Sequence, residues 1–255
     1  MHKPSNQQFA QIFDGIASRY NDVSNAYLVG KRKAILGSWA RGRCLEVGAG
    51  TGEISRYLAK SHEVVATDIS PAMVEEIKKH GIDPVRSRAR DEVASPEDRG
   101  AATSNGVEAY VCDAEQLPFE NETFDTVIAA EMLFYLDNPD NFLREAYRLL
   151  KPDGRLLISC ASNFPVKLYD QLRSWLRRMG MSRGMYFKED PLKEFMTPSK
   201  LKAMLVRHNF KIVEMSKSPI LPIASLDFLN RILEKTPLKQ FGIFIFTLAT
   251  KQINN

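Results

Sequence analysis

The clearest chemical signal in this sequence is a glycine-rich turn, Gly48–Gly52, that directly follows an apolar run. Glycines in such a turn let a ligand approach the backbone closely. Glu46 precedes the turn, and its carboxylate would repel the pyrophosphate of a dinucleotide. A dinucleotide pattern would also need glycine at position 53, where the chain has Glu53. The turn therefore favours a ligand that carries an ammonium and a sulfonium.

Acidic residues also follow the next two apolar runs. Asp68 stands 20 residues after Gly48, where a carboxylate can accept both hydroxyls of a ribose. Asp113 and Ala114 follow the third run, where a carboxylate and a backbone amide can bond the edge of an adenine. One such acid alone is commonly a helix cap or a turn residue. Three acids in equivalent places indicate one crevice at the carboxyl edge of a sheet.

The elements that must position these residues are alternating strands and helices, which are typical of a parallel sheet with crossover helices. Ser70 followed by Pro71 predicts a helix start, and Gly81 ends that helix. The strands expected from apolar runs are Cys44–Val47, Glu63–Thr67, Glu108–Cys112, Thr126–Ala130, Arg155–Ser159, Lys211–Met215 and Gly242–Thr250. Further helices are expected up to Lys60, over Asp140–Leu150 after an opening Asn138-Pro139, and to His208 after an opening Thr197-Pro198.

The first 40 residues predict two more helices. Apolar residues recur at three and four positions over Gln8–Tyr20, which indicates an amphipathic helix that Asn21–Asn25 ends. Tyr27–Trp39 predicts the second helix. Its basic residues Lys31–Lys33 are expected on a solvated face, where they would serve solubility.

Composition limits the class of protein. The chain has 255 residues, 44% of them hydrophobic, which is enough for one large α/β domain or two small ones. The net charge of +4 gives no case for nucleic acid, but residues 160–255 hold 16 basic and 7 acidic side chains. Three cysteines, no metal-ligand pair among them, and no apolar leader or membrane span predict a cytoplasmic protein without a metal site.

Five ordered segments resemble the motifs of class I S-adenosylmethionine-dependent methyltransferases. They lie within roughly residues 43–160 and are specific as a set: Leu45–Gly52, Val65–Ser70, Cys112–Phe119, Phe124–Val127 and Leu149–Leu156. Phe13–Asn21 also resembles the N-terminal helix of the ubiquinone/menaquinone biosynthesis C-methyltransferase branch. The resemblance implies a Rossmann-like α/β fold with a seven-stranded, mostly parallel sheet, an antiparallel last strand and helices on both faces.

The resemblance also implies S-adenosyl-L-methionine as the cofactor and gives each residue a role. Glu46 and the glycine turn would surround the methionine part, Asp68 with Ile69 the ribose, and Asp113 with Ala114 the adenine. Glu131 and Met132 would form the floor of the acceptor site, and Tyr20 would cover the methyl group. The expected cofactor-binding residues are Glu46, Gly48, Ala49, Gly50, Gly52, Asp68, Ile69, Asp113, Ala114 and Glu131; the acceptor-site candidates are Tyr20, Glu131 and Tyr135.

The expected organisation is a single methyltransferase domain, 1–255. It comprises an N-terminal helical lid (1–40), a cofactor-binding core (43–160) and an acceptor-site cap with the last strands (161–255). A segment rich in Arg, Ser, Pro, Asp and Gly, 83–106, is expected to be a surface loop, longer than the family norm. The family's Lys-Pro-Gly-Gly turn is Lys151–Gly154 here, with aspartate in place of the first glycine.

The motifs that the sequence lacks and the composition of its C-terminal third limit the chemical class of the acceptor. Ala130–Tyr135 lacks the Asn/Asp-Pro-Pro-aromatic signature of base-amine methylation, so no nucleic-acid substrate is expected. Val166–Phe187 and Pro219–Leu229 are apolar, with basic residues in the former, which suits a hydrophobic small-molecule acceptor of quinone-, lipid- or polyketide-like character. Peripheral contact with an anionic membrane or lipid is a further expectation for Val166–Phe187. An ordinary cover helix over the sheet is the alternative.

Two other functions stay open at this point. An NAD-dependent oxidoreductase would share the fold and Asp68, but Glu46 and Glu53 disfavour it. A non-catalytic S-adenosylmethionine-binding protein would hold the same cofactor and transfer nothing. The sequence predicts neither the methylated atom nor the oligomeric state.

Overall fold

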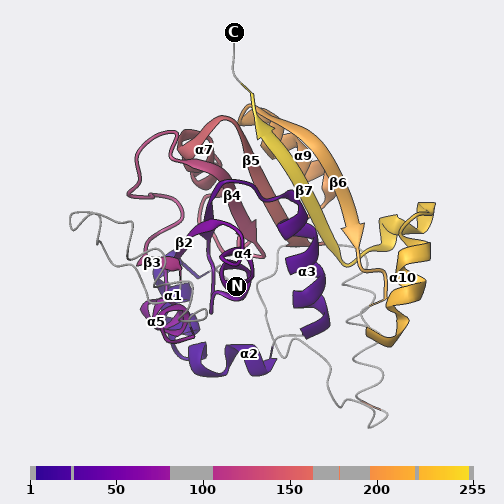
Figure 1. Cartoon of the computed structure of the whole chain (residues 1–255), viewed down its shortest axis with the longest axis horizontal. Coiled ribbons are helices and arrows are strands. Elements are labelled where there is room, and N and C mark those ends of the chain that lie inside the picture. The colour runs from indigo at the N-terminus through magenta and orange to yellow at the C-terminus, as the bar shows by residue number, and fades with distance from the viewer. Residues whose placement is uncertain are drawn as a thin grey trace.

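A seven-stranded sheet forms the centre of the part of the chain that the computed structural model describes, residues 4–23, 26–80, 106–162, 178, 196–221 and 224–252. The strand order is β3-β2-β1-β4-β5-β7-β6 (Figure 1). The strands are β1 (Arg43–Val47), β2 (Glu63–Asp68), β3 (Val107–Val111), β4 (Phe124–Ala130), β5 (Leu150–Ala161), β6 (Phe210–Ser218) and β7 (Phe244–Lys251). Neighbours from β3 to β5 pair in parallel, and β7 is antiparallel to β5 and β6. The predicted fold class is confirmed.

The order of the strands places a crevice where the sequence analysis needs one. From β1 the chain proceeds to β2 and β3 on one side, and it then returns to β4 and β5 on the other side. The carboxyl ends of β1 and β4 are therefore neighbours at a topological switch point. Ligands of open α/β sheets bind at such a point.

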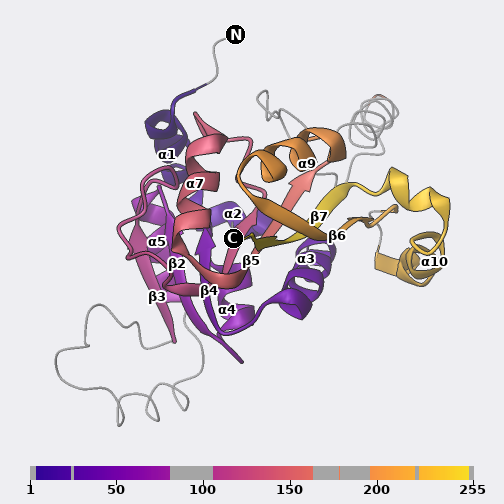
Figure 2. The ribbon, with the colours of Figure 1, turned by 90° about the horizontal axis from the view of Figure 1, so that it is seen from above.

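Helices cover both faces of the sheet (Figure 2). Two apolar clusters form the core, one on each face, because strands buried on both sides alternate their apolar side chains between the two faces. One face is covered by α7 (Pro139–Leu149) and α9 (Pro198–Arg207). The other face is covered by α3 (Ala26–Trp39), α4 (Glu53–Leu58) and α5 (Pro71–Lys79).

Three of these helices begin with the same two-residue signal. Ser70, Asn138 and Thr197 each accept a backbone N–H with the side chain, and a proline follows each of them. The cap satisfies one of the free amides of the first turn, while proline has no amide to satisfy and already has a helical φ. The three predicted helix starts are confirmed.

The predicted helix Gln8–Tyr20 is wrong as a single element. It is divided into α1 (Asn6–Asp14), the 3-10 turn η1 (Ala17–Arg19) and α2 (Tyr20–Val23), with Gly15 as the C-cap of α1. The last of these elements, α2, ends at Val23, within the expected break Asn21–Asn25, of which residues 24 and 25 lie outside the described residues. Glycine is a weak helix former, and a break there lets the preceding Asp14 bond a core loop.

Two predicted segments cannot be compared with the fold. The loop 83–106, apart from Gly106, and Val166–Phe187, apart from Arg178, lie outside the described residues. Between β6 and β7 the chain forms η3 (Ala224–Leu226), α10 (Asp227–Leu233) and η4 (Pro237–Phe241). Within the described ranges, every helix is too short or too polar to cross a membrane.

Candidate functional site

The turn between β1 and α4 combines tight packing with one open position. Gly48, Gly50 and Gly52 have φ values of +67°, +55° and +77°, a region that side chains rarely adopt. A Cβ at Gly48 would lie 2.8 Å from Cβ of Met132, and one at Gly52 would lie 2.9 Å from Cγ1 of Ile77. Around Gly50 the nearest atom to such a Cβ is Cε1 of Tyr20, at 3.7 Å. Gly50 therefore offers bare backbone to a ligand beneath Tyr20.

Asp68, the last residue of β2, is buried beside this turn. Its Oδ2 accepts the N–H of Gly50 at 2.8 Å, and its Oδ1 accepts the N–H of Ser70 at 2.9 Å. Burial raises the pKa of Asp68, and these backbone bonds oppose the rise. A carboxylate has about four acceptor positions, so two remain for the two hydroxyls of a ribose.

Glu46 lies on β1 and is almost fully buried. Its carboxyl accepts the Ser55 hydroxyl, a contact from the first turns of α4. Burial raises the pKa of Glu46 to about 7, while Ser55 and the positive charge of Arg32 act in the opposite direction. An ammonium beside this carboxyl group would oppose that rise in pKa and favour the carboxylate form.

The basic triplet of α3 corrects one prediction and adds a residue to the site. Lys31 forms an ion pair with Asp227 at 2.5 Å, and Lys33 forms one with Glu53 at 2.6 Å, so a merely solvated face is wrong. Arg32 lies between them, with its guanidinium 5.1 Å from the ring centre of Phe244. Its Nε is buried and has no hydrogen-bond partner among the described residues.

The sequence holds no local signal for the role of Arg32. Three consecutive helical residues span about 200°, which a solvated helix face can hold, and the groups beside Arg32, Phe244 and Glu46, are distant in the sequence. The charge of Arg32 acts on Glu46. An anionic group bound near Glu46 could therefore pair with Arg32.

The segment after β3 holds Asp113 and Ala114. Oδ1 of Asp113 accepts the N–H of Glu115 at 2.9 Å, and the amide group of Asn6 donates to both Asp113 oxygens, at 3.3 and 3.2 Å. Ala114 is buried against the core. The carboxylate and the loop backbone are thus fixed at the carboxyl edge, next to Asp68 on the neighbouring strand.

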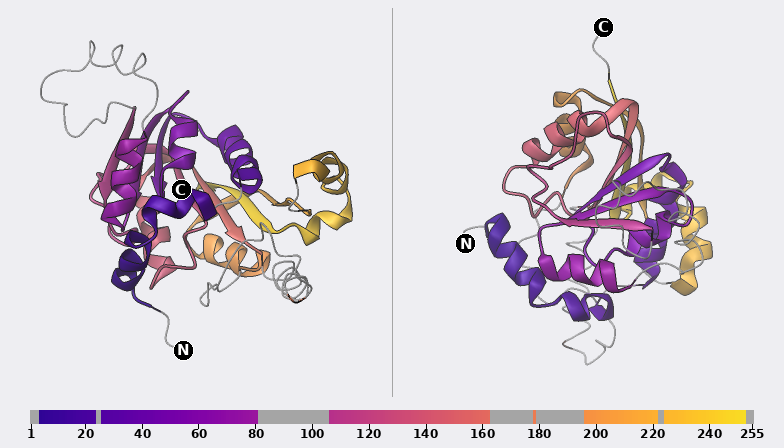
Figure 3. Two further views of the ribbon diagram at one scale, coloured as in Figure 1. Left: turned by 90° about the horizontal axis from the view of Figure 1, so that it is seen from below. Right: turned by 60° about the vertical axis from the view of Figure 1, so that its left-hand side comes forward.

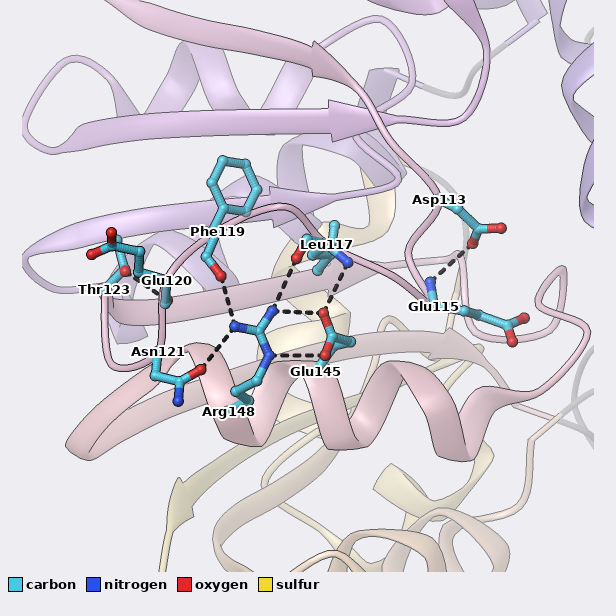
Figure 4. A network of polar contacts seen from close by, with 9 residues as sticks. All are labelled: Asp113, Glu115, Leu117, Phe119, Glu120, Asn121, Thr123, Glu145 and Arg148. Carbon is cyan, nitrogen blue, oxygen red and sulfur yellow. Dashed lines mark hydrogen bonds and ion pairs between the residues drawn. The ribbon is translucent and has the colours of Figure 1, made fainter. Parts of the chain in front are cut away.

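A clamp on α7 holds this segment in place, and the sequence analysis missed it (Figure 4). Glu145 accepts the N–H of Leu117 at 2.8 Å. Arg148 donates to the carbonyl groups of Leu117 and Phe119, at 2.9 and 2.6 Å, and pairs with Glu145 at 2.8 Å. These bonds lower the pKa of Glu145 and raise that of Arg148, so both groups are ionised at neutral pH. The acid and base three residues apart were the available signal.

Glu131 follows β4 in a backbone conformation that is unusual for its type. Its φ is +60°, and its N–H donates to the Ser159 carbonyl at 2.9 Å. The Ser159 hydroxyl donates to Oε1 of Glu131 at 3.1 Å. A non-glycine residue in this region costs about 1–3 kcal/mol, and such strain clusters at functional sites. Met132, next in sequence, packs against Gly48.

The N-terminal elements lie outside the sheet, beside α5 (Figure 3), and their side chains contact the loops that follow β1 to β4. Thr51 donates to Oδ1 of Asn21 at 2.6 Å, and Ser70 donates to Oδ1 of Asp14 at 2.5 Å. Asn6 reaches the loop after β3, as described above. Aromatic contacts complete the set: the Phe13 ring lies 5.2 Å from that of Tyr135 and 6.4 Å from that of Tyr20. The segment from α1 to α2 therefore closes the loops that follow β1, β2, β3 and β4.

The structure thus brings the predicted cofactor residues together at the ends of four neighbouring strands. Tyr20 lies over Gly50, and Tyr135 lies under the N-terminal helix, packed against Phe9 and Phe13. Ile69 is half-buried between Asp68 and the cap of α5. Among the described residues, no group of three His, Cys, Asp or Glu side chains could hold a metal ion. The roles of these residues in binding stay predictions.

Known proteins resemble both the sequence and the fold. A profile of the methyltransferase domain matches residues 45–158. A ubiquinone/menaquinone biosynthesis C-methyltransferase of Pseudomonas aeruginosa (strain LESB58) is 30% identical over 226 residues, 80% of this chain and 81% of that protein. One of Desulfotalea psychrophila is 30% identical over 57% of this chain, which spans only 54% of that relative's length.

The fold is also that of solved methyltransferases. An S-adenosylmethionine-dependent methyltransferase structure from Thermotoga maritima has a TM-score of 0.61 and 20% identity, and it covers 95% of this chain and 99% of its own. The resemblance inferred from the motifs is confirmed, and so is S-adenosylmethionine as the cofactor. The chain belongs to the class I S-adenosylmethionine-dependent methyltransferases, in the family that includes the ubiquinone/menaquinone biosynthesis C-methyltransferases.

Proposed function

We propose that this enzyme transfers the methyl group of S-adenosylmethionine to a small, hydrophobic, quinone-like acceptor. The observation that carries the proposal is the carboxyl edge of the sheet, where Asp68 accepts the Gly50 amide beneath Tyr20, with Glu46 on β1 and Asp113 after β3 on the two sides of it. The names of the relatives from P. aeruginosa and D. psychrophila support a quinone-like acceptor. The aromatic surroundings of Tyr135 suit a planar, apolar ring.

Each charged group of the crevice matches one part of the cofactor. Glu46 would bind the ammonium, and Arg32, whose Nε lacks a partner among the described residues, would bind the carboxylate of the methionine part. Asp68 has two acceptor positions left for the ribose hydroxyls. Asp113 and the amide of Ala114 would bond the adenine edge. The residues present therefore fit this cofactor.

The protein itself would contribute to the reaction by positioning the two reactants and by keeping water out of the site. The cofactor would supply an electrophilic methyl group on its sulfonium. The sulfur would leave as the neutral thioether S-adenosylhomocysteine, and the acceptor atom that gains the methyl group would release one proton to solvent. The protein must align the acceptor and exclude water, and good alignment lowers a barrier by roughly 7–11 kcal/mol. Tyr20 and Phe13 cover the crevice from the N-terminal side. Glu131, held by Ser159, and Tyr135 would contact the acceptor.

We also propose that residues 1–255 act as one domain. Strands β6 and β7 come from the C-terminal third and complete the sheet that β1 begins. The N-terminal segment bonds to loops of the core through Asn6, Asp14 and Asn21. Neither end of the described chain forms a core of its own, since both apolar clusters include strands of the central sheet.

A methyl-transfer assay tests the proposal. The purified chain would be incubated with S-adenosylmethionine labelled in its methyl group and with benzoquinols or naphthoquinols that lack one ring methyl. We expect label in the quinol product, and none with the Asp68→Ala variant. Binding of the cofactor without transfer to any quinol, but with transfer to another metabolite of a cell extract, would replace the acceptor class. Transfer to nothing at all would favour a non-catalytic binding protein.

A further inference from the structure

The excursion between β6 and β7 exposes apolar side chains in an unusual way. It projects from the end of the sheet in Figures 1 and 2. On α10, Phe228 is 65% exposed and Ile232 is 59% exposed; on η4, Leu238 is 46% and Phe241 is 37% exposed. A surface helix normally turns its apolar stripe toward the core. On α10 these two side chains instead face outward.

Polar side chains occupy the inner side of α10. Asn230 is fully buried, and its amide bonds the backbone of Leu221 in both directions at 2.8 Å and donates to the Tyr27 hydroxyl at 2.7 Å. Asp227 accepts the Tyr27 hydroxyl at 2.7 Å, and Glu234 accepts the Ser218 hydroxyl at 2.7 Å. These bonds fix the rotation of the helix. The outward direction of Phe228 and Ile232 follows from that rotation.

The charges are separated in the same way. Both acids of this excursion, Asp227 and Glu234, point inward to Lys31, Tyr27 and Ser218. The more exposed charges are basic: the Arg231 side chain is 77% exposed, although its Nε pairs with Asp227 at 3.4 Å, and Lys235 and Lys239 are exposed as well. Phe228, Arg231 and Ile232 share one face of α10, and Lys235 follows in the turn after the helix. This surface combines apolar and basic side chains, and both acids are less exposed than its bases.

The excursion also lies at the edge of the sheet where the crevice is. Ser218 at the end of β6 pairs with Phe244 of β7, which pairs with Ala161 at the end of β5. Since β6 runs in the same direction as β5, the chain enters the excursion from the carboxyl edge. The crevice opens at that edge too.

We propose that the outer face of α10–η4 binds the surface of an anionic lipid bilayer. Its residues are Phe228, Arg231, Ile232, Lys235, Leu238, Lys239 and Phe241. Apolar side chains would enter the boundary between headgroups and acyl chains, and the bases would meet anionic headgroups. A second copy of the chain fits less well, because symmetric pairing would bring like charges together. Its few exposed apolar side chains also make a small patch for a stable dimer.

The argument for membrane binding by this surface uses only its exposed side chains. Only the advantage of such binding for the enzyme rests on the proposed function. A bilayer at the outer face of α10–η4 would hold the crevice edge close to the phase in which a hydrophobic quinone dissolves. Binding to vesicles needs neither cofactor nor acceptor. The test below can therefore succeed or fail independently of the methyl-transfer assay.

Sedimentation of the full chain with vesicles tests the proposal. Vesicles of phosphatidylcholine containing roughly one-third phosphatidylglycerol should bind the chain at low salt, and binding should weaken as salt screens the bases. Pure phosphatidylcholine should bind it far less. The variant Phe228→Ser/Ile232→Ser should lose roughly tenfold or more in affinity, because apolar burial drives insertion. Replacing Arg231, Lys235 and Lys239 by Gln should lose roughly a hundredfold at low salt.

Matched controls make the result specific. Val206 and Val213 are 57% and 56% exposed on α9 and β6, so Val206→Ser/Val213→Ser removes similar exposed apolar groups elsewhere and should bind normally. Cofactor affinity should be unchanged in every variant, which shows that each one folds. Absence of binding by the unmodified chain would overturn the proposal. The proposal would also be overturned if vesicle binding were lost only when Arg173, Arg177 and Arg178 are replaced. A dimer of the unmodified chain that the Phe228→Ser/Ile232→Ser variant dissolves would overturn it too.

Discussion

The N-terminal helices and α10 are attached to the same sheet edge by the same means, yet they present opposite surfaces. In both, short polar side chains reach inward: Asn6 and Asp14 to the crevice loops, Asn230 to α3 and Leu221. On α1, Phe9 is only 4% exposed, because it packs on Tyr135. Phe228 of α10 remains in solvent. Polar anchors rather than apolar pattern decide which side of a peripheral helix faces the core.

The consequence is a division of labour along one edge. The crevice contains carboxylates that the N-terminal elements cover, so it suits a ligand with positively charged groups. The outer face of α10–η4 gathers bases and apolar groups and leaves them open, so an anionic surface suits it. Variants of the crevice should change cofactor binding without changing vesicle binding, and variants of the outer face should do the reverse.

The largest effect is expected for Asp68→Ala. The variant loses both hydroxyl bonds to the ribose, and each bond to a charged group contributes roughly 1.5–3 kcal/mol, so affinity should fall by at least about a hundredfold. It also frees the amides of Gly50 and Ser70, which should lower the free energy of unfolding. Calorimetry with S-adenosylmethionine and thermal unfolding measure the two effects. An unchanged dissociation constant would place the ribose elsewhere.

A smaller loss, roughly tenfold or more, is expected for Arg32→Gln, because a charge-assisted pair with the methionine carboxylate disappears. The adjacent Lys33→Gln is the matched control, since Lys33 already pairs with Glu53. A fragment without the amino-acid part, 5′-methylthioadenosine, should bind both variants as it binds the unmodified chain. Weaker binding of this fragment to Arg32→Gln would show a structural role for Arg32.

Local patterns in the sequence predicted the parts of the molecule that depend on local rules. Proline after a capping residue located three helix starts, and apolar runs located all seven strands. The largest difference is at β5, which begins at Leu150 rather than at Arg155 and so includes the expected turn Lys151–Gly154. The acids Asp68 and Asp113 were found because a strand end is itself a local feature. The fold therefore followed from the alternation of elements, with the antiparallel strand supplied by the family resemblance.

Contacts between distant segments could not be predicted in this way. Arg32 was assigned to a solvated face because nothing nearby in sequence shows that Phe244 and Glu46 lie beside it. The apolar stretch Pro219–Leu229 was expected to line an acceptor site, but Phe228 faces solvent. The amino-acid sequence shows that Phe228 is apolar, whereas the direction of its side chain depends on a bond of α10 to Tyr27, about 200 residues earlier in the chain.

The effect of pH on the affinity for the cofactor should be smaller than the effect of the Arg32→Gln change. The pKa of Glu46 is about 7 without ligand, and the ammonium needs the carboxylate form. The protonated carboxyl must therefore lose its proton on binding, so affinity falls as pH falls below 7. Between about pH 7.5 and pH 6 the ionised fraction, and with it the affinity, should drop roughly eightfold. Calorimetry across this range measures it, and Glu46→Gln should bind weakly without this dependence.

The smallest effect on the crevice is expected for Tyr27→Phe, which tests whether polar anchors orient α10. The change removes a hydroxyl that donates to Asp227 and accepts from the buried Asn230. An unsatisfied buried donor costs about 1–3 kcal/mol, so hydrogen exchange of the α10 amides should become faster. Affinity for S-adenosylmethionine should stay within about twofold, because such local opening leaves the carboxylates of the crevice in place. A large loss of cofactor affinity would instead show that α3 couples the two regions through its neighbouring residues Lys31 and Arg32.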